Sequence, residues 1–233
     1  MLILQNEIDI MITTLYNKFD KKKISTLPRV TFPGKIVVVL TETEAEKAVD
    51  YLLSADILGI DSETRPVFCK GKHHKVALLQ VSTHDVCFLF RLNLIGMPPC
   101  IIRLLEDTTV TKVGLSLHDD FMMLHKRTDF TTGKFIDLQN IVQEFGIEDL
   151  SLQKLYANLF HERITKREQL SNWEASILSD KQKLYAATDA WACIQIYERL
   201  RALRSTNNYE TIKVAEPEKV VSQQSENSEF TDK

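Results

Sequence analysis

The sequence predicts an α/β domain, in which a mixed sheet is flanked by helices and followed by a helical C-terminal portion. Short runs rich in Val, Ile and Leu, bounded by turn residues, recur through the first half of the chain and are typical of buried strands. Two of these runs, Val76–Ser82 and residues 86–92, are separated only by a short polar turn, which suits a hairpin. Between residues 138 and 203 the apolar spacing becomes helical.

The other elements follow from local signals in chain order. Residues 35–40 form an apolar run typical of a strand, and Thr41 followed by Glu44 resembles the capping box that begins a helix. The next apolar run, residues 57–60, predicts a buried strand. The elements expected after the hairpin are a helix at residues 98–106, a strand at 111–115, a helix at 118–125, a short strand or turn at 135–138, and helices interrupted at Gly146, 161–167 and Ser179.

The composition sets limits on the class of protein. The chain has 233 residues, of which 44% are hydrophobic and 26% charged, as in an ordinary globular domain with a sizeable core. Its net charge is −3, so any affinity for nucleic acid must come from local basic patches. Its four cysteines form no C-x-x-C pair, which argues against a zinc ribbon and against a secreted disulfide scaffold.

The chain carries no signal for a membrane or for secretion. Its longest apolar run is far too short to cross a bilayer, and residues 1–7 lack the basic region of a signal peptide. We therefore expect a cytoplasmic protein with reduced thiols and no membrane partner.

Three regions are expected along the chain. Residues 1–34 read as an N-terminal arm, partly flexible, with a run of lysines at 21–23. Residues 35–203 contain the elements of a single domain. Residues 204–233 are dominated by Ser, Asn, Gln, Glu and Lys, and this composition predicts a disordered tail because it buries too little apolar surface.

Carboxylates from two distant segments are candidates for one site. Asp61 and Glu63 follow a buried strand and are two residues apart, so both point to the same side. Tyr185 and Asp189 share the inward stripe of a helix, where an ionised carboxylate costs several kcal/mol unless it is paired or binds a metal. Asp189 alone could equally cap a helix or pair with an arginine. Together, the four side chains favour a hard-metal site for phosphodiester cleavage.

A third segment offers two adjacent acids, Asp119 and Asp120. If a helix begins near His118, Leu117 and Phe121 mark its inward face. At ~100° per residue Asp120 falls within that face, whereas Asp119 points away from it. The helix register therefore assigns the functional role to Asp120.

These residues lie in motifs that resemble those of the DEDDy 3′-5′ exonuclease family. The likeness covers roughly residues 35–203, and the motifs occur in the family's order at residues 59–63, 112–120, 171–173 and 184–190. Ribonuclease D relatives often carry an acidic residue before the motif tryptophan, whereas this chain has Asn172. That difference favours the Werner-type branch of the family, with ribonuclease D more distant.

The resemblance implies a ribonuclease H-like fold and removal of nucleotides from the 3′ end of DNA or RNA. It also implies two divalent ions, Mg²⁺ or Mn²⁺, which suit an all-oxygen ligand set. Carried over residue by residue, Asp61, Glu63 and Asp189 would hold one ion. Asp61 would bridge to a second ion, which Asp120 would support through water, and Tyr185 would orient the attacking water.

Basic side chains near the motifs are candidates for contacts with the phosphates of a nucleic acid that has a free 3′ end. A solvated charged loop is an equally good interpretation of each. Two other functions use the same fold, a nucleic-acid-binding module that does not cut and an endonuclease. The complete set of four acids and a tyrosine favours an enzyme over the binding module. The candidate substrate contacts are Arg65, Lys70, Lys72, Lys75 and Arg167.

Overall fold

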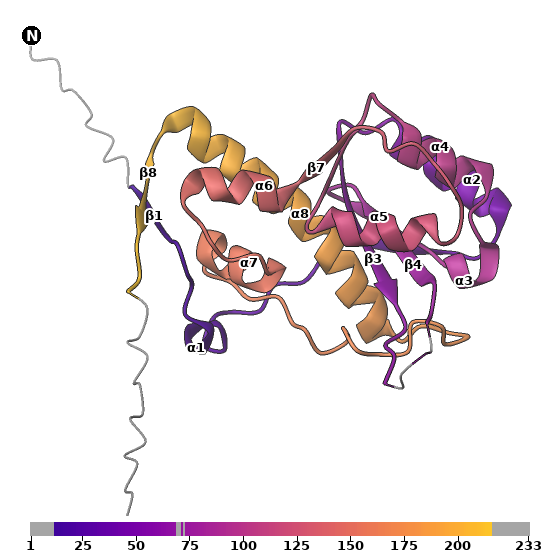
Figure 1. The fold of residues 1–233 in the computed structure, drawn as a ribbon, viewed down its shortest axis with the longest axis horizontal. Helices are drawn as coiled ribbons and strands as arrows, with labels where there is room; N and C mark the ends of the chain where they lie inside the picture. The colour runs from indigo at the N-terminus through magenta and orange to yellow at the C-terminus, as the bar shows by residue number, and fades with distance from the viewer. Residues whose placement is uncertain (1–11, 69–70, 72, 216–233) are drawn as a thin grey trace, which may run out of the picture.

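The computed structural model describes residues 12–68, 71 and 73–215, and its centre is a six-stranded mixed sheet (Figure 1). The strand order is β2-β5-β4-β3-β6-β7. Only β4 runs antiparallel to its neighbours, and it forms the expected hairpin with β5. The strands are β2 (Lys35–Val39), β3 (Ile57–Thr64), β4 (Val76–Ser82), β5 (Val86–Phe90), β6 (Thr111–Gly114) and β7 (Phe135–Asp137).

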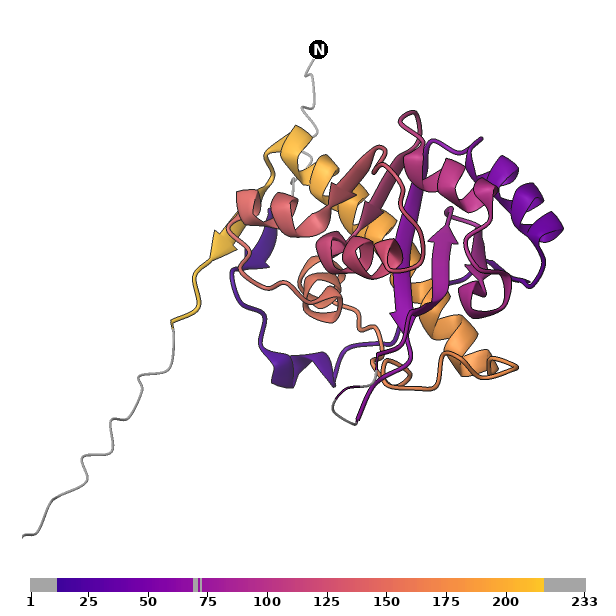
Figure 2. The ribbon, with the colours of Figure 1, turned by 45° about the vertical axis from the view of Figure 1, so that its right-hand side comes forward.

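Helices cover both faces of this sheet (Figure 2), so the predicted mixed sheet with flanking helices is confirmed. Alternate residues of the strands contribute to two separate cores, as Leu78 and Leu79 on β4 show. The long helix α8 (Asp180–Thr206) packs on one face with α7 (Leu152–Phe160). The other helices are α2 (Glu42–Leu52), α3 (Leu92–Ile95), α4 (Pro99–Glu106), α5 (Leu117–His125), α6 (Leu138–Val142) and the 3₁₀ helix η1 (Gln143–Phe145).

Local signals in the sequence fix where the helices begin. Thr41 and Glu44 form the predicted capping box at the start of α2. Ser179 and Gln182 form a second capping box, which begins α8 immediately after the expected break. In both boxes the side chains satisfy backbone N–H groups that have no partner within the helix.

Helix α8 lies very close to β3, and Gly59 makes this approach possible. A Cβ atom at Gly59 would lie 1.9 Å from the backbone oxygen of Ala190. Ala186, Ala187 and Ala190 are fully buried along the same part of the helix. Small residues on both elements therefore let the helix backbone sit directly over the strand that carries Asp61.

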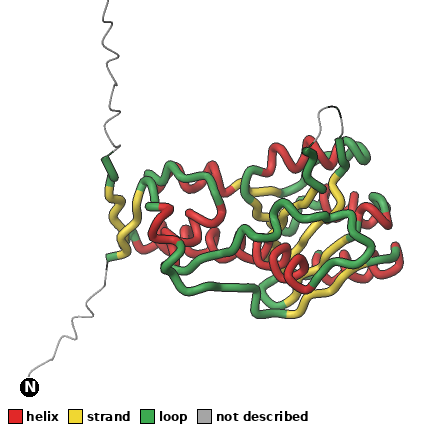
Figure 3. The backbone as a smooth tube through the Cα atoms, turned by 90° about the horizontal axis from the view of Figure 1, so that it is seen from below, coloured by secondary structure: helices red, strands yellow, loops and turns green. Residues whose placement is uncertain are grey.

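The chain termini contribute more structure than the composition predicts. Strand β1 (Thr13–Tyr16) pairs in parallel with β8 (Tyr209–Ile212), and Figure 3 shows this pair apart from the main sheet. The prediction of a disordered tail is therefore wrong for residues 204–212, while residues 216–233 lie outside the described part of the chain. The reason is pairing with a distant strand, which local composition does not reveal.

The N-terminal arm is also integrated into the fold. It contains β1 and the short helix α1 (Lys21–Ile24). Leu15 and Phe32 are buried in the core under α8, and the Phe32 backbone N–H donates to the Thr188 hydroxyl at 3.0 Å. The arm thus reaches the helix at the residue before Asp189.

No helix in the described part of the chain is long and apolar enough to cross a membrane.

Candidate active site

Three carboxylates from β3 and α8 converge on one point. Asp61, Glu63 and Asp189 each offer an oxygen, and these three oxygens lie within 4.8 Å of one another. Asp61 and Glu63 share the face of β3 that contacts α8 because side chains alternate along a strand. Asp189 precedes Ala190, where α8 comes closest to the strand. The convergence expected from strand and helix geometry is present.

The residues of this cluster fit a divalent cation. Asp189 is only 6% exposed, and its Oδ1 atom is buried without a hydrogen-bond partner among the described residues. A buried anionic oxygen without a donor is costly, and a bound cation removes that cost. Because every ligand is a carboxylate oxygen, a hard ion such as Mg²⁺ or Mn²⁺ matches the set.

Burial raises the pKa values of these carboxyl groups, and mutual repulsion adds to the shift for Asp61 and Glu63. Burial holds the pKa of Asp61 well above its usual range, and the charges of Asp120 and Asp189 raise it further. Burial and the neighbouring acids raise the pKa of Glu63 to about 10. Burial raises the pKa of Asp189 to about 7, although hydrogen bonding by Tyr185 and the charge of Lys166 oppose the shift. The cluster therefore binds protons readily when no cation is present.

Asp120 joins the cluster from α5, which begins at Leu117 as the helix register requires. Asp120 is half-buried and accepts a hydrogen bond from the Ser62 hydroxyl, while Asp119 is exposed. Burial is the main cause that raises the pKa of Asp120 to about 6. The structure thus places Asp120 next to β3, outside the group of three oxygens but close enough to affect Asp61.

Two polar residues that the sequence analysis did not single out hold this arrangement. Ser62 lies between the two acids of β3 and fixes Asp120 by the hydrogen bond above. The Asp137 carboxylate accepts from the backbone N–H groups of Ser116 at 3.0 Å and Leu117 at 2.9 Å, and so holds the start of α5. The position of Ser62 inside the first motif is a usable signal, whereas the contact of Asp137 joins distant segments.

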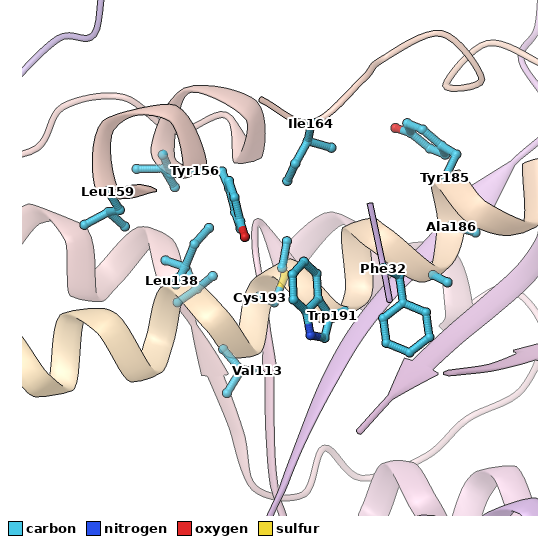
Figure 4. Packing of buried hydrophobic residues seen from close by; sticks show 14 of the residues in the cluster. Phe32, Val113, Leu138, Tyr156, Leu159, Ile164, Tyr185, Ala186, Trp191 and Cys193 are labelled. Atoms are coloured by element: carbon cyan, nitrogen blue, oxygen red, sulfur yellow. The ribbon is translucent and has the colours of Figure 1, made fainter. Parts of the chain in front are cut away.

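Tyr185 lies one helical turn before Asp189, at one end of the buried cluster in Figure 4. Tyr185 is 6% exposed, and its ring packs against that of Trp173, with the ring centroids 6.0 Å apart. Burial, with the charges of Asp189 and Glu63, holds the pKa of the phenol far above its usual range. The hydroxyl therefore stays protonated and can donate a hydrogen bond beside the carboxylates.

The candidate substrate contacts have different environments. Arg65 is exposed and forms an ion pair with Glu174 at 3.3 Å. Lys75 and Arg167 are exposed, and Lys70 and Lys72 lie outside the described residues. Lys166, the neighbour of Arg167 on the same loop, is close enough to the acids for its charge to lower the pKa of Asp189.

Comparisons with known proteins show the family to which the chain belongs. The family model for 3′-5′ exonucleases matches residues 36–203. The chain belongs to the 3′-5′ exonuclease family. It is 30% identical over 190 residues to the mouse bifunctional 3′-5′ exonuclease/ATP-dependent helicase WRN. This alignment covers 77% of this chain but only 14% of the mouse protein. A 3′-5′ exonuclease of Arabidopsis thaliana is 29% identical over 209 residues, covering 82% of this chain and 73% of the plant protein.

Solved structures show the same fold for this exonuclease-family domain. The Nibbler EXO domain of Aedes aegypti superimposes with a TM-score of 0.69 at 20% identity, over 78% of this chain and 95% of that domain. RNase D of Escherichia coli gives a TM-score of 0.65 at 17% identity, over 74% of this chain and 45% of that one. These neighbours confirm the ribonuclease H-like fold.

One further polar side chain lies beside the acidic cluster. Gln80 of β4 is fully buried and stands directly opposite Asp61 in the antiparallel pairing of β3 and β4. Neither the nitrogen nor the oxygen of its side-chain amide has a hydrogen-bond partner among the described residues. A buried polar group without a partner costs about 1–3 kcal/mol, so the amide would gain from a hydrogen bond to a polar group nearby.

The two adjacent acids of α5 can be tested as a matched pair. We expect Asp120→Asn to reduce nucleic-acid hydrolysis nearly to background, because the inward carboxylate that contacts Ser62 loses its charge. Asp119→Asn should leave hydrolysis within a few-fold of the unmodified chain, because that side chain is exposed. Initial rates on a labelled oligonucleotide measure both. The reverse pattern would contradict the assignment of Asp120.

The raised pKa values predict how stability depends on pH. Asp120 and Asp189 have folded-state pKa values of about 6 and about 7, against a usual value of 3.8. Between these limits the folded chain holds protons that the unfolded chain has lost, so the free energy of unfolding falls as pH rises. We expect the melting temperature in excess chelator to fall from pH 5 to pH 8.

A divalent cation should offset this loss, because it neutralises the same carboxylates. Adding Mn²⁺ should therefore raise the melting temperature more at pH 8 than at pH 5. The Asp189→Asn variant is the control, since it should show a weaker fall with pH and a smaller response to Mn²⁺. A melting temperature that rises with pH in chelator would show that the cluster does not hold protons.

Proposed function

We propose that this chain is a 3′-5′ exonuclease that removes nucleotides from the 3′ end of DNA or RNA by hydrolysis with two divalent ions. The observation that carries this proposal is the convergence of Asp61, Glu63 and Asp189, with a buried Asp189 oxygen that has no other partner. A module that only binds nucleic acid has no need for repelling carboxylates in a buried position. The match to the exonuclease family supports catalysis rather than binding alone.

Each acid has a role that its position allows. Asp61, Glu63 and Asp189 would hold one Mg²⁺ or Mn²⁺ ion, and Asp61 would also reach a second ion that Asp120 supports through water. Bound there, the ions would supply an activated water and would stabilise the leaving oxygen. Ser62 keeps Asp120 in place by its hydrogen bond. The protein thus provides a fixed array of oxygens on a rigid strand and helix.

Tyr185 and the basic loop would act on the water and on the substrate. The phenol stays protonated beside Asp189, so it can hold the attacking water by donating or accepting a hydrogen bond. Lys166 and Arg167 are exposed on the loop near Asp189 and would contact the phosphates next to the scissile bond. Lys70, Lys72 and Lys75 would extend such contacts along the nucleic-acid strand. Arg65 would first have to break its ion pair with Glu174 before it could contact a phosphate.

The decisive experiment follows the products of hydrolysis. Single-stranded DNA, 3′-recessed DNA and RNA, each labelled at the 5′ end, should give a ladder that shortens from the 3′ end when Mg²⁺ or Mn²⁺ is present. Asp61→Ala should abolish the ladder, because Asp61 would contact both ions, while nucleic-acid binding survives better than turnover. The exposed-acid variant Asp119→Asn is the matched control. Internal cuts would indicate an endonuclease, and full hydrolysis in excess chelator would exclude the two-ion mechanism.

Tyr185→Phe tests the role of the phenol. The ring still fills its place against Trp173, so the variant should fold normally and keep its melting temperature. Loss of the hydroxyl that positions water should lower kcat on the order of 10²–10³-fold. The matched control is Tyr156→Phe, which removes another buried phenol hydroxyl from the same core and should leave kcat nearly unchanged. Equal rates for the two variants would exclude the proposed role.

A further inference from the structure

The buried amide of Gln80 shares the sheet face that carries the acids. In the pairing of β3 with β4, Asp61 stands opposite Gln80, and Glu63 stands opposite Leu78. Directly opposed residues of antiparallel strands lie on the same face, with Cβ atoms about 4.5–5.5 Å apart. The amide of a glutamine extends well beyond its Cβ atom, so it can reach the carboxylate of Asp61.

The neighbours of Gln80 on this face leave Asp61 as its natural partner. Leu78, two residues away on β4, and Leu89, opposite on β5, are fully buried and apolar. The Ser82 hydroxyl, on the other side of Gln80, donates to the backbone oxygen of Thr83 at 2.7 Å. Among the neighbours of Gln80 on β3, β4 and β5, the carboxylate of Asp61 is therefore the polar group best able to accept a hydrogen bond from the amide.

We propose that Gln80 is a positioning residue of the metal site, whose side-chain amide donates a hydrogen bond to Asp61 and holds that carboxylate in its ligating orientation. This inference rests on the proposed function, in which Asp61 contacts both ions. A carboxylate has more lone pairs than its metal contacts occupy, and ligating carboxylates are usually held by a second hydrogen-bond partner. The required change is small, because the terminal torsion of a glutamine side chain is broad.

The neutral amide suits this position better than a charged donor would. A lysine or arginine opposite Asp61 would compete with the cations for the same carboxylate. An apolar residue would leave Asp61 with the backbone N–H of Ser62 as a donor but without a side-chain donor from β4. Glutamine supplies the donor without adding charge to a cluster whose negative charge must attract two divalent ions. A hydrogen bond to Asp61 would also give this buried amide a partner.

The test compares Gln80→Met, which removes the amide and nearly keeps the volume, with the control Leu89→Met on the neighbouring strand. The full chain is titrated with Mn²⁺ by calorimetry, and unfolding is followed separately in chelator. In chelator, Gln80→Met should melt at the same temperature as the unmodified chain or higher, because no hydrogen bond is lost. Its dissociation constant for Mn²⁺ should rise by about 10–100-fold, and Leu89→Met should stay within about twofold.

A second readout uses the dependence of hydrolysis on Mn²⁺. The concentration that gives half-maximal rate should rise in Gln80→Met in parallel with the dissociation constant. Gln80→Leu provides the same comparison if the methionine variant unfolds. An unchanged dissociation constant in a folded variant would overturn the role of Gln80 while leaving the proposed function intact. Failure of the unmodified chain to bind Mn²⁺ would overturn both.

Discussion

The close approach of helix α8 to strand β3 is the constraint on which the rest of the structure depends. Gly59 has no side chain where the backbone of Ala190 passes, and the neighbouring helical residues are small. This contact brings Asp189 beside Asp61 and Glu63. A larger residue at Gly59 would push the helix away from the strand and separate the acids. The close approach of Gly59 to Ala190 thus sets the distance between acids that lie more than 120 residues apart in the sequence.

The fold tolerates a cluster that opposes its own stability. Burial raises the pKa values of all four acids, and repulsion by neighbouring acids adds to the shift for Asp61, Glu63 and Asp120, so these groups hold protons that an exposed carboxylate would release. Gln80 adds a buried amide without a partner to the same face. Two well-packed cores, one on each side of the sheet, hold β3 and α8 in place despite these costs. Strained functional groups are typically maintained in this way by the structure around them.

Local periodicity was sufficient to predict which acids point to a common side, but not the polar residues that hold or flank them. Asp61 and Glu63 follow from the two-residue period of a strand, and Asp120 and Asp189 follow from the angle per residue of a helix. The position of Gln80 opposite Asp61 depends on the register between β3 and β4, and the cap that Asp137 provides joins segments about 20 residues apart. Likewise, the pairing of β1 with β8 joins the two ends of the described chain. Such contacts join segments that are distant in the sequence, so a short stretch of sequence does not reveal them.

The parallel pairing of β1 with β8 has a mechanical consequence. Thr13 pairs with Tyr209 and Tyr16 with Ile212, so the chain enters this pair at one end and leaves it at the other. A force that pulls on the two ends of the domain acts along the strands and loads their hydrogen bonds in shear. All of these bonds must then yield together, whereas an antiparallel pair loaded from adjacent ends would open one bond at a time. The parallel pairing of β1 with β8 would therefore resist a force on the two ends of the domain more strongly than an antiparallel pair of the same length.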